Sequence, residues 1–190
     1  MKARRVQDLD PDGALADNAE RIVRVRLDEL CGFMPKAADP DEVVALHDMR
    51  IAAKRLRYIL EVTGPCFGPY ARTATKLVKD LQDLLGEIHD CDVQIPATAA
   101  FAADLQADDA AALRAAAGAA DDLDPALLKQ APHAREHAGL AALETHLQAR
   151  RLLLFDRFLE LWAEYERKGL RARLEYAVTE RSGGVSIGAP

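Results

Sequence analysis

The chain has 190 residues, of which 49% are hydrophobic and 29% are charged, and its formal net charge is −6 at pH 7. This composition suits one globular domain with a sizeable core, which excludes a disordered polypeptide, and no apolar run approaches the ~20 residues that a membrane-spanning helix needs. The acidic balance argues against a generic nucleic-acid binder, and the first residues lack the apolar centre of a secretory signal, so we expect a cytoplasmic protein without a membrane partner.

The first half of the chain is expected to form two helices. Apolar residues recur at helical spacing over residues 15–33, and sustained strand-like alternation is absent. The core face of this first helix is expected to carry Ile22, Val23, Leu27 and Leu30. A second helix is predicted over residues 41–62, because Asp39 offers an N-cap and Pro40 suits the first helical position.

Two longer helices are expected in the remainder. The third starts near residue 69, and Pro96 either kinks it or ends it, although the alanine-rich residues 97–120 are able to extend it with little burial. The last long helix is predicted over residues 139–167, and further helical turns follow to residue 179. Its apolar stripe is expected to contain Leu143, Leu147, Leu154, Phe155, Phe158, Leu159 and Trp162.

Four long amphipathic helices with short connections predict an all-α fold, an antiparallel four-helix bundle. We divide the chain into an N-terminal tail (residues 1–13), a helical domain (residues 14–180) and a flexible C-terminal tail (residues 181–190). Charge is polarised along the domain. Residues 47–79 hold seven Lys or Arg and two acidic residues, whereas residues 104–124 hold six Asp and one Arg. The average charge therefore hides a basic segment.

Residues 47–58 carry the most informative pattern in the chain. A histidine and four Lys or Arg occupy barely three turns of the predicted second helix. One face of this helix carries His47, Arg50, Lys54, Arg57 and Tyr58. Acidic residues at the (i, i+4) positions are mostly missing, so we expect this face to bind a polyanion. Arg55 lies ~80° around the helix from the centre of this basic face. We expect it either to flank the ligand or to form a structural ion pair.

Two patterns in this sequence resemble the CHAD family, the conserved-histidine α-helical domain. The first is H-x-x-R-x-x-x-K-R-x-R, beginning at His47, and the second is L-G-x-x-H-D-x-D-V, beginning at Leu85. The resemblance implies a helical bundle that binds inorganic polyphosphate and associates with polyphosphate granules. The positions that match the family's motifs are His47, Arg50, Lys54, Arg55, Arg57 and His89.

This chain departs from the family in one respect. The family usually contains two four-helix halves related by approximate twofold symmetry, each with its own basic helix, whereas this chain shows one such motif. The resemblance therefore implies half of a typical double bundle. Either the chain binds polyphosphate as a half-site, or it forms a homodimer that rebuilds the symmetry.

Cations on other helices are expected to widen the site. On the third predicted helix these are Arg72, Lys76 and Lys79, and on the last they are His146, Arg150 and Arg157. Asp83 and Asp90 lie on the same face of the third helix, and pairing with them would reduce its positive charge. His89 has two interpretations, a ligand-facing side chain or a buried histidine that is hydrogen-bonded to backbone or to Asp92.

Two alternative functions stay open. The pairs His47-Asp48 and His89-Asp90 are similar to the ligands of metal-dependent phosphohydrolases, although the cations around His47 disfavour a divalent metal. A protein-interaction module is the second, with the basic helix docking an acidic partner such as the acidic segment of another copy. Nucleic acid is unfavoured because Tyr58 is the one aromatic residue on the basic face.

We expect no catalytic residue, no metal and no cofactor. His133 and His137 are one helical turn apart, but a third ligand is not evident, so we expect both to be exposed to solvent. The three cysteines, Cys31, Cys66 and Cys91, are odd in number and widely spaced. We therefore expect reduced thiols in the core and no disulfide framework.

Overall fold

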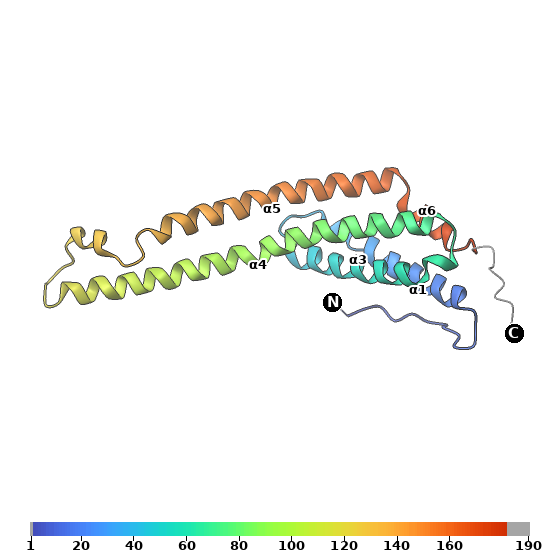
Figure 1. The fold of residues 1–190 in the computed structure, drawn as a ribbon, viewed down its shortest axis with the longest axis horizontal. Coiled ribbons are helices and arrows are strands. Elements are labelled where there is room, and N and C mark those ends of the chain that lie inside the picture. Colours follow the sequence, from blue (N-terminus) through green and yellow to red (C-terminus); the bar gives the residue numbers. More distant parts are fainter. Residues whose placement is uncertain (1, 182–190) are drawn as a thin grey trace. The chain divides into compact units, whose positions relative to one another are not determined.

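The computed structural model describes residues 2–181, which form six α-helices and two short 3₁₀ helices (Figure 1). The α-helices are α1 (Leu15–Cys31), α2 (Met34–Ala37), α3 (Val43–Thr63), α4 (Tyr70–Ala117), α5 (Glu136–Arg167) and α6 (Leu170–Ala177). The 3₁₀ helices are η1 (Gly64–Cys66) and η2 (Pro125–Gln130). The predicted all-α helical bundle is confirmed. Most of the predicted C-terminal tail, residues 182–190, lies outside the described residues.

The chain divides into two compact units, which are described separately. The described part of the first unit comprises residues 2–89 and 154–181, and the second unit is Asp90–Leu153. Helices α4 and α5 each contribute residues to both units. No helix in the described part of the chain is both long enough and apolar enough to cross a membrane.

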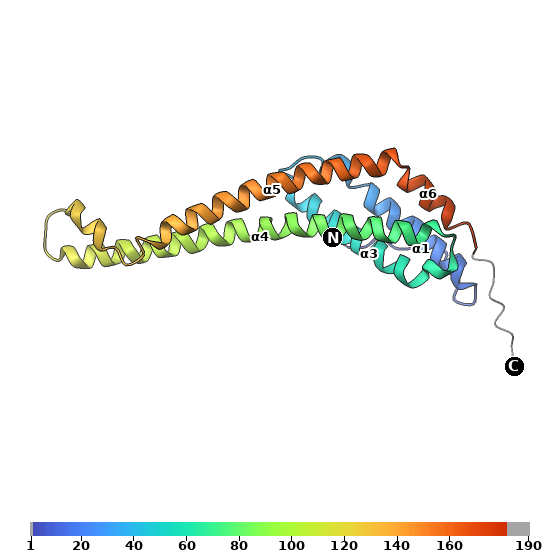
Figure 2. The same cartoon turned by 45° about the horizontal axis from the view of Figure 1, so that its top comes forward.

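The first unit contains most of the hydrophobic core. Helices α1 and α3 lie against each other, next to the beginning of α4 (Figures 1 and 2). Phe158 of α5 is fully buried, and its ring centroid lies 5.9 Å from that of Phe155. Tyr165 donates a hydrogen bond of 2.9 Å to the carbonyl of Leu77, which ties α5 to α4, and burial raises the pKa of this phenol. Gly169 links α5 to α6 with a φ of 65°, a conformation that residues with a Cβ rarely adopt.

The start of α3 differs from the prediction. The helix begins at Val43, and Glu42 occupies the N-cap position without a side-chain capping bond. The predicted cap, Asp39, instead accepts a hydrogen bond of 2.9 Å from the backbone N–H of Asp41. The Asp39-Pro40 signal is therefore used for a turn, which the same residue types also favour.

Glu29 of α1 fixes the position of the chain segment that precedes α1. Glu29 is buried, with a relative exposure of 2%, and its carboxylate pairs with Arg26 and accepts the backbone N–H of Arg4. The Arg26 guanidinium also donates a hydrogen bond of 2.8 Å to the carbonyl of Arg4. A buried carboxylate needs such partners, so the position of the chain around Arg4 is coupled to α1.

The second unit is a helical hairpin in which parts of α4 and α5 run antiparallel (Figure 2). Pro96 lies inside α4, so of the two predicted alternatives the one in which it ends the helix is wrong, and the alanine-rich extension is confirmed to Ala117. Leu143 was predicted in the apolar stripe of the last helix but is 44% exposed. In this stretch α5 faces small alanine side chains, which leave little surface to bury against.

His133 and His137 are not the freely exposed pair that the sequence suggested. Both are half-buried and bind Asp109 of α4, through the backbone N–H of His133 at 2.9 Å and Nε2 of His137 at 2.8 Å. Burial alone would raise the pKa of Asp109, but these hydrogen bonds outweigh it and lower the pKa below its usual range. The pair therefore closes the hairpin near its tip.

This arrangement makes the hairpin tip sensitive to acid. The depressed pKa of Asp109 stabilises the folded tip at pH values above the unfolded pKa of about 4, and this contribution is lost as the pH falls through the folded pKa. We expect amide hydrogen exchange at residues 131–137, corrected for intrinsic rates, to lose protection as the pH falls below about 4. Asp109→Asn should remove most of this pH dependence, and a wild-type tip with constant protection would contradict the assignment.

Candidate functional site

Two side-chain contacts join α3 to α4 on the basic side of α3. His47 Nδ1 lies 3.4 Å from His89 Nδ1, and the two imidazole rings are 4.6 Å apart at their centroids. One turn further along α3, Arg50 Nε lies 3.5 Å from the place that a Cβ would take at Gly86. Both motif histidines are half-buried, so His89 contacts another site residue and is not enclosed in the core.

These contacts also set the register of the two helices. His47 is level with His89, and Arg50 is level with Gly86. Residues later in α3 therefore lie beside residues earlier in α4, as expected for antiparallel helices. The same register places Lys54 level with Gln82. The five residues that share this side of α3 are called the basic face: His47, Arg50, Lys54, Arg57 and Tyr58.

Arg50 is the least satisfied member of the basic face. Its Nε is buried, and no hydrogen-bond or ion-pair partner for the guanidinium is present among residues 2–181. The Oε1 atom of Gln82 is likewise buried without a hydrogen-bond partner in the described chain. Leaving a buried polar group unpaired costs about 1–3 kcal/mol, and such groups in native proteins usually have a role. The seam between α3 and α4 thus contains unused hydrogen-bonding capacity.

The positive charges of Lys54 and Arg57 differ in whether an acidic side chain lies beside them. Lys54 is exposed, and its Nζ lies 5.7 Å from the centroid of the Tyr58 ring, a contact that leaves its positive charge intact. Arg57 stacks on the same ring at 4.9 Å, but its Nε also lies 3.1 Å from Oε1 of Glu61. Arg57 therefore brings less free charge to the basic face than Lys54 does.

Removing this acidic neighbour should strengthen anion binding. We expect Glu61→Gln to raise the affinity of the basic face for a polyanion by up to ~1 kcal/mol, because an exposed ion pair is worth about that much and Arg57 is released from it. Glu160→Gln on α5 is the matched control, since Glu160 lines a different cavity. Equal affinities of Glu61→Gln and wild type, measured by calorimetric titration, would show that Arg57 does not contact the ligand.

The other predicted cations of α4 lie in different surroundings. Lys79 pairs with Asp83 at 2.6 Å, so the expected muting by an acidic neighbour is confirmed for this residue. Arg72 is exposed and lines a cavity of about 450 Å³ together with Gly64, beyond the end of α3. Lys76 is also exposed. Arg72 and Lys76 thus remain candidates to extend the basic face.

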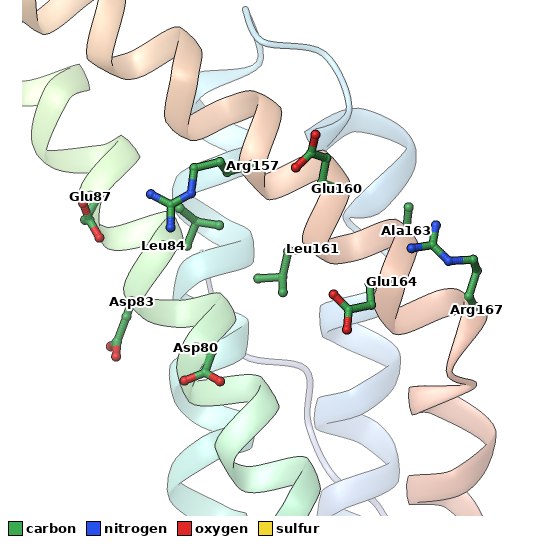
Figure 3. A pocket seen from close by; sticks show the side chains of 10 residues that line it. All are labelled: Asp80, Asp83, Leu84, Glu87, Arg157, Glu160, Leu161, Ala163, Glu164 and Arg167. Carbon is green, nitrogen blue, oxygen red and sulfur yellow. The ribbon is translucent and has the colours of Figure 1, made fainter.

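The predicted cations of α5 are divided between the two units. His146 and Arg150 belong to the second unit, where Arg150 donates to the Cys91 sulfur at 3.4 Å. Arg157 belongs to the first unit and lines a cavity of about 720 Å³ between α4 and α5 (Figure 3). The carboxylates that line the same cavity are Asp80, Asp83, Glu87, Glu160 and Glu164. Surroundings this acidic disfavour a polyanion at Arg157.

The described residues hold no group of three or more His, Cys, Asp or Glu side chains able to bind one metal ion. The cysteines are unpaired; Cys91 is buried, whereas Cys31 and Cys66 are half-buried and so only partly within the expected core. Burial raises the pKa of the Cys31 thiol to about 11, so this cysteine stays protonated at neutral pH.

Comparison with known families decides the family of this chain. The CHAD domain family model matches residues 2–99, slightly more than half of the sequence. The chain belongs to the CHAD family. No match was found among curated proteins or among solved structures. CHAD domains in general bind polyphosphate-type ligands.

The matched residues of the CHAD domain include the whole basic face and His89, whereas His146, Arg150 and Arg157 fall outside them. Sequence reasoning quoted Gly86 within the second CHAD motif but gave it no role. A glycine inside a helix costs about 1 kcal/mol relative to alanine, which is a signal for close packing at that position. In the structure, the neighbour of Gly86 is the Arg50 guanidinium, which lies at an ordinary contact distance from the place of a Cβ and so leaves room for an alanine.

Proposed function

We propose that this CHAD domain binds inorganic polyphosphate on the basic face of α3. The observation that carries the proposal is Arg50, whose guanidinium packs against Gly86 with a buried, unpartnered Nε among the described residues. Guanidinium groups bind phosphate oxygens with paired, charge-assisted hydrogen bonds. The His47 and His89 rings lie one turn away and offer further nitrogen donors to the same anion.

The spacing of the cations favours a linear polymer over a single phosphate. Along the helix axis, Arg50 and Lys54 are separated by ~6 Å, and Lys54 and Arg57 by ~4.5 Å. From His47 to Gly64, where Arg72 lines the adjoining cavity, the axis advances ~25 Å. A flexible chain with a charge on each phosphate is able to contact these groups one after another.

We further propose that binding is not coupled to hydrolysis and that the bound protein associates with polyphosphate granules. Family membership supports the ligand class, and the cations of the basic face are suited to binding phosphate groups. Incubation with long-chain polyphosphate should release no free phosphate above that of buffer, with or without a chelator. Chelator-sensitive phosphate release would replace this proposal with the metal-dependent phosphohydrolase alternative.

Chain length provides the test of the ligand. We expect the affinity to rise with polyphosphate length until the polymer spans the basic face, and to stay constant per occupied site beyond that length. Single-stranded DNA in excess should displace little of the bound polyphosphate, because the basic face has a single aromatic residue on which bases could stack. Calorimetric titrations with a series of chain lengths measure both effects. Equal affinity for DNA and polyphosphate at one salt concentration would indicate a generic polyanion site.

A further inference from the structure

The second unit buries few residues and exposes several large apolar side chains. Of the described residues of Asp90–Leu153, the buried ones are Cys91, Asp109 and Leu147. Large apolar side chains are exposed on both of its helices: Val93, Phe101, Leu143, Leu152 and Leu153. Helices gain most of their stability from packing of an apolar face, and exposed apolar surface of this kind commonly marks an interaction site.

The outer side of α4 in this unit combines apolar and acidic residues. Phe101 is 55% exposed, and Asp104 and Asp108 follow it on the same face, three and seven residues later. Neither aspartate has a hydrogen-bond or ion-pair partner within residues 2–181. We call Phe101, Asp104 and Asp108 the acidic face.

Helix α3 carries a surface of the opposite charge. Tyr58 is 47% exposed and Val62 is 74% exposed, and they lie one turn apart on the outside of the helix. Lys54 lies one turn before Tyr58, with its ammonium group near the ring and no acidic partner in the described chain. We call Lys54, Tyr58 and Val62 the docking face of α3; it shares Lys54 and Tyr58 with the basic face.

We propose that the docking face of α3 binds the acidic face of a second copy of this chain. The acidic face presents exposed Phe101 beside two negative charges, and the docking face presents exposed Tyr58 and Val62 beside one positive charge. Pairing of two acidic faces would bring like charges together, which costs free energy. In a twofold dimer the contact occurs twice, so each copy supplies one docking face and one acidic face to its partner.

This contact has a consequence for ligand binding. Lys54 belongs to both the docking face and the basic face, so a polyphosphate chain and a second copy compete for it. The competition rests on the proposed function, whereas the dimer contact itself does not.

A charge exchange tests the contact. The chain should show a concentration-dependent increase in mass by sedimentation at low ionic strength, and this increase should weaken at high ionic strength. Asp104→Lys/Asp108→Lys and, separately, Lys54→Glu should each raise the dimer dissociation constant at least ~10-fold, as unfavourable charge pairs do. An equimolar mixture of the two variants should dimerise again, because both contacts in the mixed dimer then join opposite charges.

The variants distinguish loss of the dimer contact from loss of polyphosphate binding. At concentrations low enough for wild type to be monomeric, Asp104→Lys/Asp108→Lys should keep the wild-type affinity for polyphosphate, while Lys54→Glu should lose affinity for both partners. A wild-type chain that stays monomeric at every concentration overturns the dimer contact, even when polyphosphate binding is intact. Dimerisation that survives both charge reversals, as expected for pairing of two hairpins, overturns it as well.

Discussion

The double variant Arg50→Ala/Lys54→Ala is expected to bind long-chain polyphosphate at least ~30-fold more weakly than wild type. Each side chain supplies a charge-assisted hydrogen bond worth about 1–3 kcal/mol, and ~1.4 kcal/mol corresponds to a tenfold change in affinity. Neither side chain has an acidic partner among the described residues, so its removal leaves no buried carboxylate behind. The loss should therefore appear in binding and not in folding.

The control for this variant is a lysine of the first unit outside the basic face. Lys168 is exposed and pairs with Glu164 on α5, so Lys168→Ala should retain wild-type affinity to within about twofold, as expected for an exposed ion pair. Circular dichroism melting should give similar midpoints for all three proteins. A double variant with undiminished affinity would remove the basic face from the binding site.

Phe158→Ala is expected to lower the free energy of unfolding by about 3–5 kcal/mol. The Phe158 side chain is fully buried in α5, and its ring packs near that of Phe155 in the first unit. Truncation removes apolar surface from the core and leaves a cavity that rigid neighbouring helices fill only in part. Urea denaturation followed by far-UV circular dichroism measures the change.

Tyr176→Ala is the comparison for this substitution, because it removes an aromatic ring that is 65% exposed on α6. A surface substitution of this kind should change the free energy of unfolding by no more than about 0.5 kcal/mol. Similar losses for Phe158→Ala and Tyr176→Ala would mean that the first unit does not have the core described here.

The helices of this chain were largely predictable because their apolar residues recur with a regular period. Helix α5 begins three residues before the predicted start and ends at the predicted residue. Two local signals were ambiguous. Asp39-Pro40 is compatible with a helix start or a turn, and Pro96 is compatible with a helix end or a helix interior. The period of the apolar residues does not decide between these outcomes.

The basic face was predictable in its members but not in its partners. Periodicity alone placed Arg50 and Lys54 on one face. The ion pair of Arg57 with Glu61 was not predicted, although the two residues have the (i, i+4) spacing that allows it. The contact of His47 with His89 joins residues 42 positions apart, so it depends on the register of two helices. The spacing of residues within α5 likewise does not predict the acidic cavity at Arg157, because three of the five carboxylates that line it come from α4.

The most direct test of the central claim is the nuclear magnetic resonance signal of the Arg50 Nε–Hε group, assigned by its loss in Arg50→Ala. This nitrogen is buried against α4 and lacks a hydrogen-bond partner among the described residues. On addition of long-chain polyphosphate we expect its chemical shift to change in proportion to site occupancy, while the signal of Arg171, which already pairs with Asp28 and Glu175, stays in place. Saturation binding with an unmoved Arg50 signal would contradict the account.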